Sequence, residues 1–355
     1  MGHAQSMAEQ TTVNLGSLLE RARRGDAAAQ YTLGKHYLAG RVIPRDPKRA
    51  QRWFTEAASQ DHTKAQYRLG CLLMRGAVDQ PDPAAAAALL QRAAAAGHAD
   101  AIARLAQFSR DGIGQPRNLD RAAELYRSAA SRGSAIGCYN LAYMYDNGIG
   151  LTEDPIKAVG WYQIAADAGH SQAQLQLGRA YAHGRGLDQN AAKAVYWYRR
   201  AARTGYCKAQ YNLALMIASG NGTEQNDQEA AMWFERAARQ GYAKAQYTFG
   251  LLNRQGFGTE KNIDLAVHWF RRAALQNYGR AQYALGRSLL LDENDDTFGE
   301  GQRLRAAAWL FIAAETGYER AVAAFRKLYR TLNEKDRQQV LILARDLQGQ
   351  IREAA

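Results

Sequence analysis

The feature that most constrains this chain is a 36-residue motif that recurs eight times in one register. Segments such as AQYRLGCLLM, AQLQLGRAYA and AQYNLALMIA begin the copies, whose first aligned residues are Ala29, Ala65, Ala101, Gly137, Ala173, Ala209, Ala245 and Ala281. We number each copy from this residue, which is position 0. Position 4 is Leu in every copy except one, which has Phe249, and position 5 is always Gly or Ala. A chain of 355 residues could hold two or three globular domains, but a fixed period of this length is typical of stacked repeats.

Each copy predicts two helices joined by a short turn. Apolar positions 0, 4 and 8 recur at helical spacing, and the first helix should end at a glycine such as Gly76 or Gly220, where the left-handed backbone suits glycine. The second helix carries a pair of large apolar residues, for example Trp197-Tyr198, followed three residues later by an alanine pair, Ala201-Ala202. The large side chains fill space between hairpins while the alanines let helix axes approach closely.

This pattern resembles the Sel-1-like repeat family, a relative of the tetratricopeptide repeat. Residues 173–208, AQLQLGRAYAHGRGLDQNAAKAVYWYRRAARTGYCK, follow the family's string A-x-x-x-L-G-x-x-Y-x-x-G-x-G…K-A-x-x-W-Y-x-x-A-A-x-x-G almost throughout. The resemblance implies an all-α fold: a right-handed α/α superhelical solenoid of about eight 36-residue hairpins with N- and C-terminal capping helices. It also implies an adaptor or scaffold in signalling, secretion or envelope assemblies, because the shared motif residues build the core of the family's fold rather than a catalytic site.

The repeat frame divides the chain into four parts. We expect a disordered N-terminus or non-native remnant over residues 1–13, a capping helix over 14–28, eight repeats over 29–320 and capping helices over 321–355. The eighth copy has four extra residues in its loop, Asp292–Gln302. Its tryptophan, Trp309, therefore lies four residues later than the repeat register would place it. Asn333 offers a start for the last helix, whose apolar residues form one stripe: Val340, Leu343, Leu347 and Ile351.

Charge and cysteine content bear on partners and location. The net charge is +12, all of it before residue 281, because residues 281–355 hold 11 basic and 11 acidic side chains. Such a field favours acidic partners. Met1–Gln10 contain no signal-peptide pattern, no apolar run is long enough to span a bilayer, and the three cysteines are not motif-spaced. These observations predict a cytoplasmic protein, or a periplasmic one if the native N-terminus is missing from the sequence.

One stripe of the first helix is the candidate binding surface. Positions −1, 2, 6 and 9 fall at about 180–260° on the helical wheel, opposite the core positions. In tetratricopeptide-type folds the corresponding stripe lines the concave groove, and here it combines tyrosines with cations. The candidate residues are Lys35, Lys64, Tyr67, Tyr139, Arg179, Lys208, Tyr211, Lys244, Tyr247, Arg254, Arg280, Tyr283 and Arg287. Among them, Lys208, Lys244 and Arg280 are the strongest candidates.

The stripe would suit an extended peptide that carries acidic residues, since tyrosine gives rigid contact area and the cations orient carboxylates. The competing interpretation is that the tyrosines are half-buried packing residues of the repeat and the cations are an ordinary solvated surface.

The sequence predicts no catalytic residue, metal site or cofactor. His62, His98 and His170 all occupy position 33, where other copies have tyrosine, so the repeat register explains them. The acidic run Asp292–Asp296 resembles the start of a calcium loop, but Thr297 and Arg303 stand where that loop needs glycine and glutamate. A solvated acidic insertion is the better interpretation.

Two other functions remain as alternatives. The basic character and the helical-hairpin period also occur in RNA-binding helical repeats, although no base-reading pair varies systematically between the copies. A hydrolase of envelope material is the third hypothesis, and the sequence supplies no nucleophile for it. A non-catalytic scaffold with a protein partner is therefore the leading hypothesis, with no membrane span and with the oligomeric state open.

Overall fold

The computed structural model describes residues 15–76, 78, 80–291 and 300–354, and all secondary structure in these ranges is helical. The predicted terminal segment 1–13 and most of the acidic insertion, including Asp292–Asp296, lie outside the described residues. The chain divides into two compact units, residues 1–173 (unit 1) and residues 174–355 (unit 2). Each unit is described by itself.

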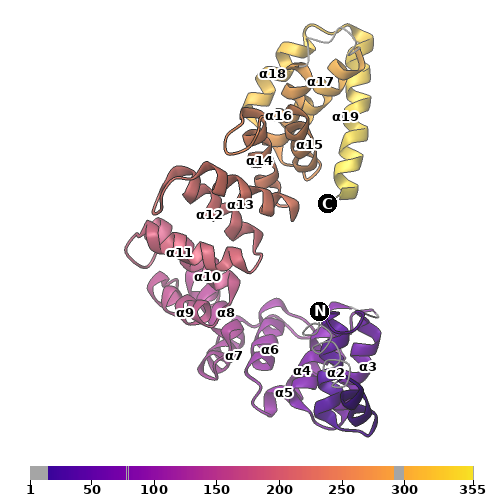
Figure 1. Ribbon diagram of the computed structural model, residues 1–355, viewed down its shortest axis with the longest axis vertical. Helices are drawn as coiled ribbons and strands as arrows, with labels where there is room; N and C mark the ends of the chain where they lie inside the picture. The colour runs from indigo at the N-terminus through magenta and orange to yellow at the C-terminus, as the bar shows by residue number, and fades with distance from the viewer. Residues whose placement is uncertain (1–14, 77, 79, 292–299, 355) are drawn as a thin grey trace, which may run out of the picture. The chain divides into compact units, whose positions relative to one another are not determined.

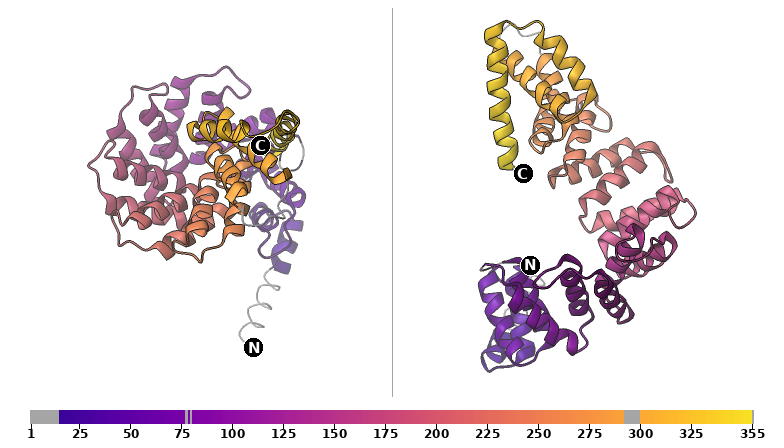
Figure 2. Two further views of the ribbon diagram at one scale, coloured as in Figure 1. Left: turned by 90° about the horizontal axis from the view of Figure 1, so that it is seen from above. Right: turned by 180° about the vertical axis from the view of Figure 1, so that it is seen from behind.

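Unit 1 is a stack of helical hairpins (Figures 1 and 2). Residues 15–23 form a first helix, which ends five residues earlier than the predicted capping helix. The hairpins that follow pair α2 with α3, α4 with α5, α6 with α7, and α8 with α9. Their bounds are α2 (Ala27–Ala39), α3 (Pro47–Ser59), α4 (Thr63–Arg75), α5 (Pro83–Ala95), α6 (Ala99–Asp111), α7 (Leu119–Ser131), α8 (Ala135–Asn147) and α9 (Pro155–Asp167).

Unit 2 continues the pattern after α10, the helix within which the two units divide (Ser171–His183). Here α12 pairs with α13, α14 with α15 and α16 with α17, and the last helix packs on α17. The bounds are α11 (Ala191–Arg203), α12 (Cys207–Ser219), α13 (Asp227–Arg239), α14 (Ala243–Gln255), α15 (Ile263–Ala274), α16 (Gly279–Leu291), α17 (Glu300–Glu315), α18 (Glu319–Tyr329) and α19 (Glu334–Ala354). The predicted all-α solenoid of helical hairpins is confirmed.

Capping residues explain where the helices begin and end. The first helix of a hairpin stops at a left-handed glycine, as predicted, for example Gly76 (φ 57°) and Gly220 (φ 66°). The second helix begins after an Asp or Asn at position 17, whose side chain accepts the N–H three residues later. These caps were not among the predicted features of the repeat, and they are Asp46, Asp82, Asn118, Asp154, Asn190, Asn226 and Asn262.

The second glycine of the turn connects successive hairpins. At Gly258 the backbone φ is 65°, and a Cβ atom would collide with the backbone carbonyl of Asp227, which begins α13 one hairpin earlier. Gly222 has the same relation to Ala191 at the start of α11. The absence of a side chain at this glycine therefore lets the backbones of two successive hairpins come into contact.

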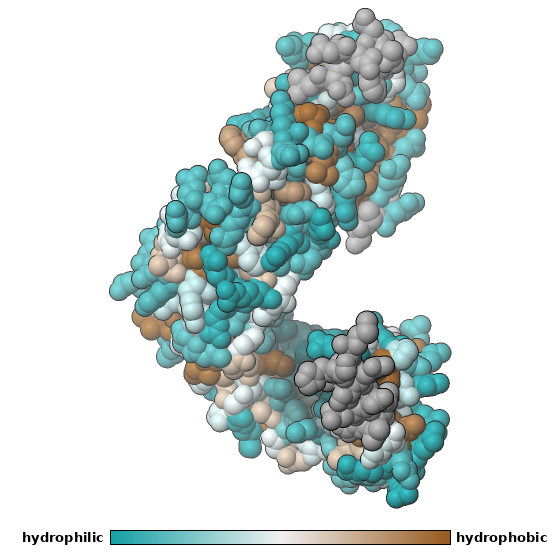
Figure 3. All heavy atoms as spheres, viewed as in Figure 1, coloured by the Kyte–Doolittle hydropathy of each residue, from teal (hydrophilic) through white to brown (hydrophobic). Residues whose placement is uncertain are grey.

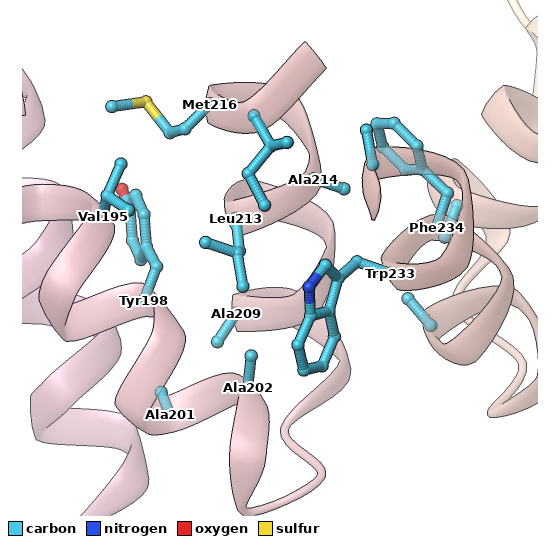
Figure 4. Packing of buried hydrophobic residues seen from close by; sticks show 14 of the residues in the cluster. Val195, Tyr198, Ala201, Ala202, Ala209, Leu213, Ala214, Met216, Trp233 and Phe234 are labelled. Atoms are coloured by element: carbon cyan, nitrogen blue, oxygen red, sulfur yellow. The ribbon is translucent and has the colours of Figure 1, made fainter. Parts of the chain in front are cut away.

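The core consists of the predicted large apolar residues and alanine pairs. Figure 4 shows Leu213 of α12 between Tyr198 of the preceding hairpin and Trp233 of its own hairpin. Gly178 lies directly against the ring of Tyr198. A Cβ atom at Gly178 would be only 2.6 Å from the ring carbon Cδ1, which is too close. Small residues at position 5 therefore make room for the large residue of the second helix.

A glutamine at position 1 links most hairpins through the core. Gln210 and Gln246 are buried, and each side-chain amide donates to a carbonyl at the end of the preceding helix, that of Ala202 or Ala238, at 3.2 and 3.1 Å. The side-chain amide of Gln276 in turn donates to the side-chain oxygen Oε1 of Gln246 at 2.7 Å. The amides of Gln210 and Gln246 are thereby satisfied, and the last carbonyls of the preceding helix gain a partner.

Hydrophilic residues cover most of the face of both units that is visible in Figure 3, with hydrophobic residues in small separate patches. No helix in the described part of the chain is both long and apolar enough to cross a membrane.

Candidate protein-interaction surface

The first helices of successive hairpins in unit 2 enclose a pocket of about 430 Å³, which we call the Lys208 pocket. Helices α10, α12 and α14 supply most of its walls. The lining residues are Leu175, Arg179, Ala182, His183, Tyr198, Lys208, Tyr211, Asn212, Leu215, Met216, Tyr242 and Lys244. Most of them occupy positions −1, 2, 3 or 6 of the repeat, so the pocket arises from the same stripe of consecutive helices.

The inner wall of the Lys208 pocket is apolar and aromatic. Leu175 and Met216 are buried, and Tyr198 is buried with its pKa raised to about 12, chiefly by desolvation. The Tyr211 ring is half-buried and packs edge-on against Tyr242, with ring centroids 5.3 Å apart. This wall offers rigid rings, a geometry that suits apolar or aromatic side chains of a ligand.

The outer edge of the Lys208 pocket is cationic. Arg179, Lys208 and Lys244 are exposed, and none of the described residues lining the pocket is acidic. Arg179 contacts Gln176 at 3.4 Å, while neither lysine forms an ion pair with a described residue. The arrangement can therefore attract a carboxylate without first breaking an internal salt bridge.

The tyrosines at position 2 pack against a neighbouring ring, and most of them also remain partly exposed to solvent. Each packs against the ring at position 33 of its own copy, which precedes the next hairpin, with centroids 4.5–5.6 Å apart. The pairs are Tyr31–His62, Tyr67–His98, Tyr139–His170, Tyr211–Tyr242, Tyr247–Tyr278 and Tyr283–Tyr318. Tyr67 is only 8% exposed, so its ring serves mainly as packing, whereas the other five are half-buried.

The histidines at position 33 are helix N-caps. The Nδ1 atoms of His62, His98 and His170 accept the backbone N–H of Ala65, Ala101 and Ala173 at 3.2–3.3 Å. Burial is the main cause that lowers the pKa of all three. In unit 2, Tyr206 and Tyr242 occupy the same position and make no side-chain cap. The register thus explains these histidines, as predicted, and the structure adds the role that they perform there.

Unit 1 contains a second pocket, of about 840 Å³, which we call the Arg104 pocket. It lies between α6, the following loop and α8. Its lining residues are Arg104, Gln107, Arg110, Asp111, Arg117, Ile136, Tyr139, Asn140, Tyr143, Ile149, His170 and Gln172. Its positively charged side chains are all arginines, and one carboxylate, Asp111, lies among them.

The predicted binding residues divide between these pockets and other places. Tyr139 lines the Arg104 pocket, and Arg179, Lys208, Tyr211 and Lys244 line the Lys208 pocket. Neither pocket includes Lys35, Lys64, Tyr67, Tyr247, Arg254, Arg280, Tyr283 or Arg287. Their role in binding stays a prediction.

Some of the residues outside the pockets have internal contacts. Lys35 lies 4.9 Å from the centre of the Tyr31 ring, Arg254 lies 5.8 Å from that of Phe270, and Arg280 hydrogen-bonds to Tyr278. Arg280, one of the three strongest candidates, thus lies apart from the pocket that Lys208 and Lys244 share.

Sequence reasoning missed position 3, which supplies Arg104, Asn140 and Asn212 to the pockets. On the wheel this position falls at about 300°, between the predicted stripe and the core. A signal was present, because position 3 is polar in every copy except the last, where it is Ala284. No group of three or more His, Cys, Asp or Glu side chains with metal-binding geometry occurs among the residues that the structure describes.

Comparison with known families finds seven consecutive matches to the Sel1 repeat. They cover residues 27–62, 63–98, 99–134, 135–170, 171–206, 207–242 and 243–278. The family's frame starts two residues before our position 0, at the first residue of helices such as α2 and α4. The eighth copy, with its insertion, follows the matched region as the α16–α17 hairpin. No curated protein matches the chain significantly.

Two solved structures resemble the chain in sequence and fold. One is c5321, a protective antigen of uropathogenic Escherichia coli with an SLR fold, which is 30% identical with a TM-score of 0.67. The alignment covers 96% of this chain and 72% of that protein. The other is a Sel1 repeat protein from Oxalobacter formigenes, 28% identical with a TM-score of 0.59, over 89% of this chain and 91% of that one.

Proposed function

The chain belongs to the Sel1 repeat family, whose members are generally protein-interaction scaffolds, and on this premise we propose that it is a non-catalytic scaffold. The partner segment is extended and acidic, and it binds in the Lys208 pocket. One observation carries the proposal: three exposed cations surround an aromatic wall, and no described lining residue is acidic.

Binding would proceed in two physical stages. The positive field attracts an acidic segment and raises the association rate, because opposite charges steer the encounter. Apolar side chains of the segment then pack on Tyr211 and Met216, while its carboxylates contact Arg179, Lys208 and Lys244. The pocket is large enough for one or two side chains, so the rest of an extended segment would lie along neighbouring first helices.

The proposed setting is bacterial signalling, secretion or envelope regulation. The two solved relatives come from bacteria, and all three cysteines of this chain are free, which suits a reducing cytoplasm.

The test uses a phage-displayed random peptide library selected against the full chain. Selected peptides should be enriched in Asp and Glu, and their affinity, measured by fluorescence anisotropy, should fall as salt is raised. The triple variant Arg179→Gln, Lys208→Gln, Lys244→Gln should bind at least about tenfold more weakly, which is about 1.4 kcal/mol. Because all three residues are exposed, the variant should fold normally.

A matched control removes the same number of charges elsewhere in unit 2. Arg203, Lys261 and Arg271 are exposed and lie outside the pocket, so their triple change to Gln should leave the affinity unchanged. If both triple variants weaken binding equally, only net charge matters and the pocket assignment is wrong. Selected peptides without acidic enrichment would refute the proposed partner chemistry.

A further inference from the structure

The Arg104 pocket differs from the Lys208 pocket in the kind of cation that it presents. Arg104 and Arg110 come from α6 and Arg117 from the loop before α7, and none of the described lining residues is a lysine. A guanidinium group is a planar fork that can donate two parallel hydrogen bonds to one anion, whereas an ammonium group acts as a point charge. The pocket therefore offers directional recognition of an oxyanion.

A hydrogen-bond network fixes two of the arginines. Arg110 donates to both carboxylate oxygens of Asp111, from Nε at 2.7 Å and Nη2 at 3.1 Å, and donates from Nη1 to Asn140 at 3.0 Å. Arg104 donates from Nη1 to Gln107 at 3.0 Å, and Gln107 also hydrogen-bonds to Asp111. The charged groups are thus held in place before any ligand arrives, which reduces the entropy lost on binding.

The charges within the Arg104 pocket do not balance. Asp111 is already paired with Arg110, which leaves the charges of Arg104 and Arg117 without a carboxylate among the described lining residues. The Arg104 guanidinium also hydrogen-bonds to the side chains of Tyr67 and Cys71, neither of which is a carboxylate, and its buried Nε atom has no hydrogen-bond partner. Asp100 lies outside the lining, and its carboxylate accepts from the Ser134 hydroxyl at 2.6 Å. The described lining residues thus carry two positive charges in excess, which matches a dianion better than a single carboxylate.

Aromatic and apolar groups border these charges. The Tyr139 ring stacks on His170 with centroids 4.6 Å apart, and Tyr143, Ile136 and Ile149 complete the wall. A volume of about 840 Å³ leaves room for several atoms beside one anionic group. The ligand is therefore larger than a free ion and carries groups that can pack against rings.

We propose that the Arg104 pocket binds a phosphorylated side chain of a peptide. A phosphomonoester carries about −1.5 to −2 charges at pH 7 and three acceptor oxygens, so it meets both the excess charge and the fork geometry of Arg104 and Arg117. This inference goes beyond the proposed function, because it concerns different residues, a different unit and a ligand of different charge.

The test compares three peptide libraries with random flanks and one fixed central residue: serine, phosphoserine or glutamate. Binding of each fluorescent library to the full chain is measured by anisotropy at constant salt. The phosphoserine library should bind at least about tenfold more tightly than the glutamate library, and the serine library should bind most weakly. Equal binding of the phosphoserine and glutamate libraries would overturn the proposal.

Variants then locate the site. Arg117 is exposed, so Arg117→Gln should fold normally and lower phosphopeptide affinity about fivefold or more. Arg104→Lys keeps the charge but removes the fork, and it should have a similar effect. The control Arg132→Gln removes an exposed charge outside the pocket and should change nothing.

Inorganic phosphate serves as the probe for a ligand that is not a peptide. If phosphate alone binds with the affinity of the phosphoserine library, the flanking residues contribute nothing and the peptide assignment is wrong. Unchanged phosphopeptide binding by both Arg104→Lys and Arg117→Gln, with unfolding temperatures equal to the native protein, would also overturn it.

Discussion

Acidification should destabilise unit 1 selectively, because three of its helix N-caps are histidines. An imidazole can accept the backbone N–H of a first turn only while its Nδ1 atom is unprotonated. His62, His98 and His170 all cap in this way, through bonds of 3.2–3.3 Å, whereas Tyr206 and Tyr242 in unit 2 form no side-chain cap. Lowering the pH from 7.5 to 5 should therefore protonate these histidines and remove their caps.

The direction of the effect follows from the pKa shifts. Burial holds the pKa of each capping histidine below its ordinary value of 6.5, so the unfolded chain binds more protons than the folded chain. Stability is therefore complete above about pH 7 and decreases as the pH falls through 6.5 toward the lower folded pKa. An N-cap is worth about 1 kcal/mol, so the loss approaches about 3 kcal/mol if the three caps contribute independently.

Four carboxylates of unit 1 have shifted pKa values, and these lose their stabilising effect only at lower pH. The pKa values of Asp26, Asp61, Asp111 and Asp154 are lowered, chiefly by hydrogen bonds to the carboxylates, from an ordinary value of 3.8. Their stabilising effect is present above that value and is lost only as the pH falls further, through their folded pKa values. Between pH 7.5 and 5 the expected loss therefore comes from the three capping histidines rather than from these four carboxylates.

Amide hydrogen exchange measured by mass spectrometry, corrected for intrinsic rates, checks this prediction helix by helix. Helices α4 and α6 should lose protection between pH 7.5 and 5, while α12 and α14 should not. The variant His62→Asn, His98→Asn, His170→Asn keeps a capping oxygen that does not titrate, so its α4 and α6 should lose little protection. The histidine caps are not the cause if this variant loses as much protection as the native chain, or if the helices of both units lose protection in parallel.

Three further predictions concern single residues of unit 2, each measured by amide exchange and urea unfolding of the full chain. Gly258→Ala should cost about 1–3 kcal/mol more than Gly241→Ala, because both residues have positive φ but only Gly258 touches backbone of the preceding hairpin. Equal costs would show that the close approach is unimportant. Gln246→Ala should cost about 2 kcal/mol, since it removes the partner of the Ala238 carbonyl and of the Gln276 amide. The control is Gln228→Ala, since Gln228 is exposed. A similar loss of unfolding free energy in both variants would contradict a stabilising role for the buried glutamine at position 1. Asn226→Ala should destabilise α13 by about 1 kcal/mol and Asn226→Asp by much less, and the cap has no such role if both behave alike.

The repeat register by itself determined the architecture. Residues at fixed offsets within 36 positions specify local structure, because helical periodicity, left-handed glycines and large-to-small packing act over short distances along the chain. For this reason the sequence alone predicts the hairpins and the helix ends at glycines such as Gly76. It also explains His62, His98 and His170 by their place in the repeat. The Asp and Asn caps at position 17 could have been found in the same way.

The two candidate pockets depend on distances between side chains of different helices, and the repeat register does not determine these distances. Lys208 and Lys244 occupy the same position as Arg280, and yet only the two lysines line the pocket with Arg179. Which of these equivalent side chains converge depends on the packing of neighbouring helices and on side-chain rotamers, which differ from hairpin to hairpin. The Arg104 network is the clearest case, since it needs Gln107 and Asp111 one turn apart on α6 and Asn140 across on α8. Only the tertiary structure brings those groups within hydrogen-bond distance.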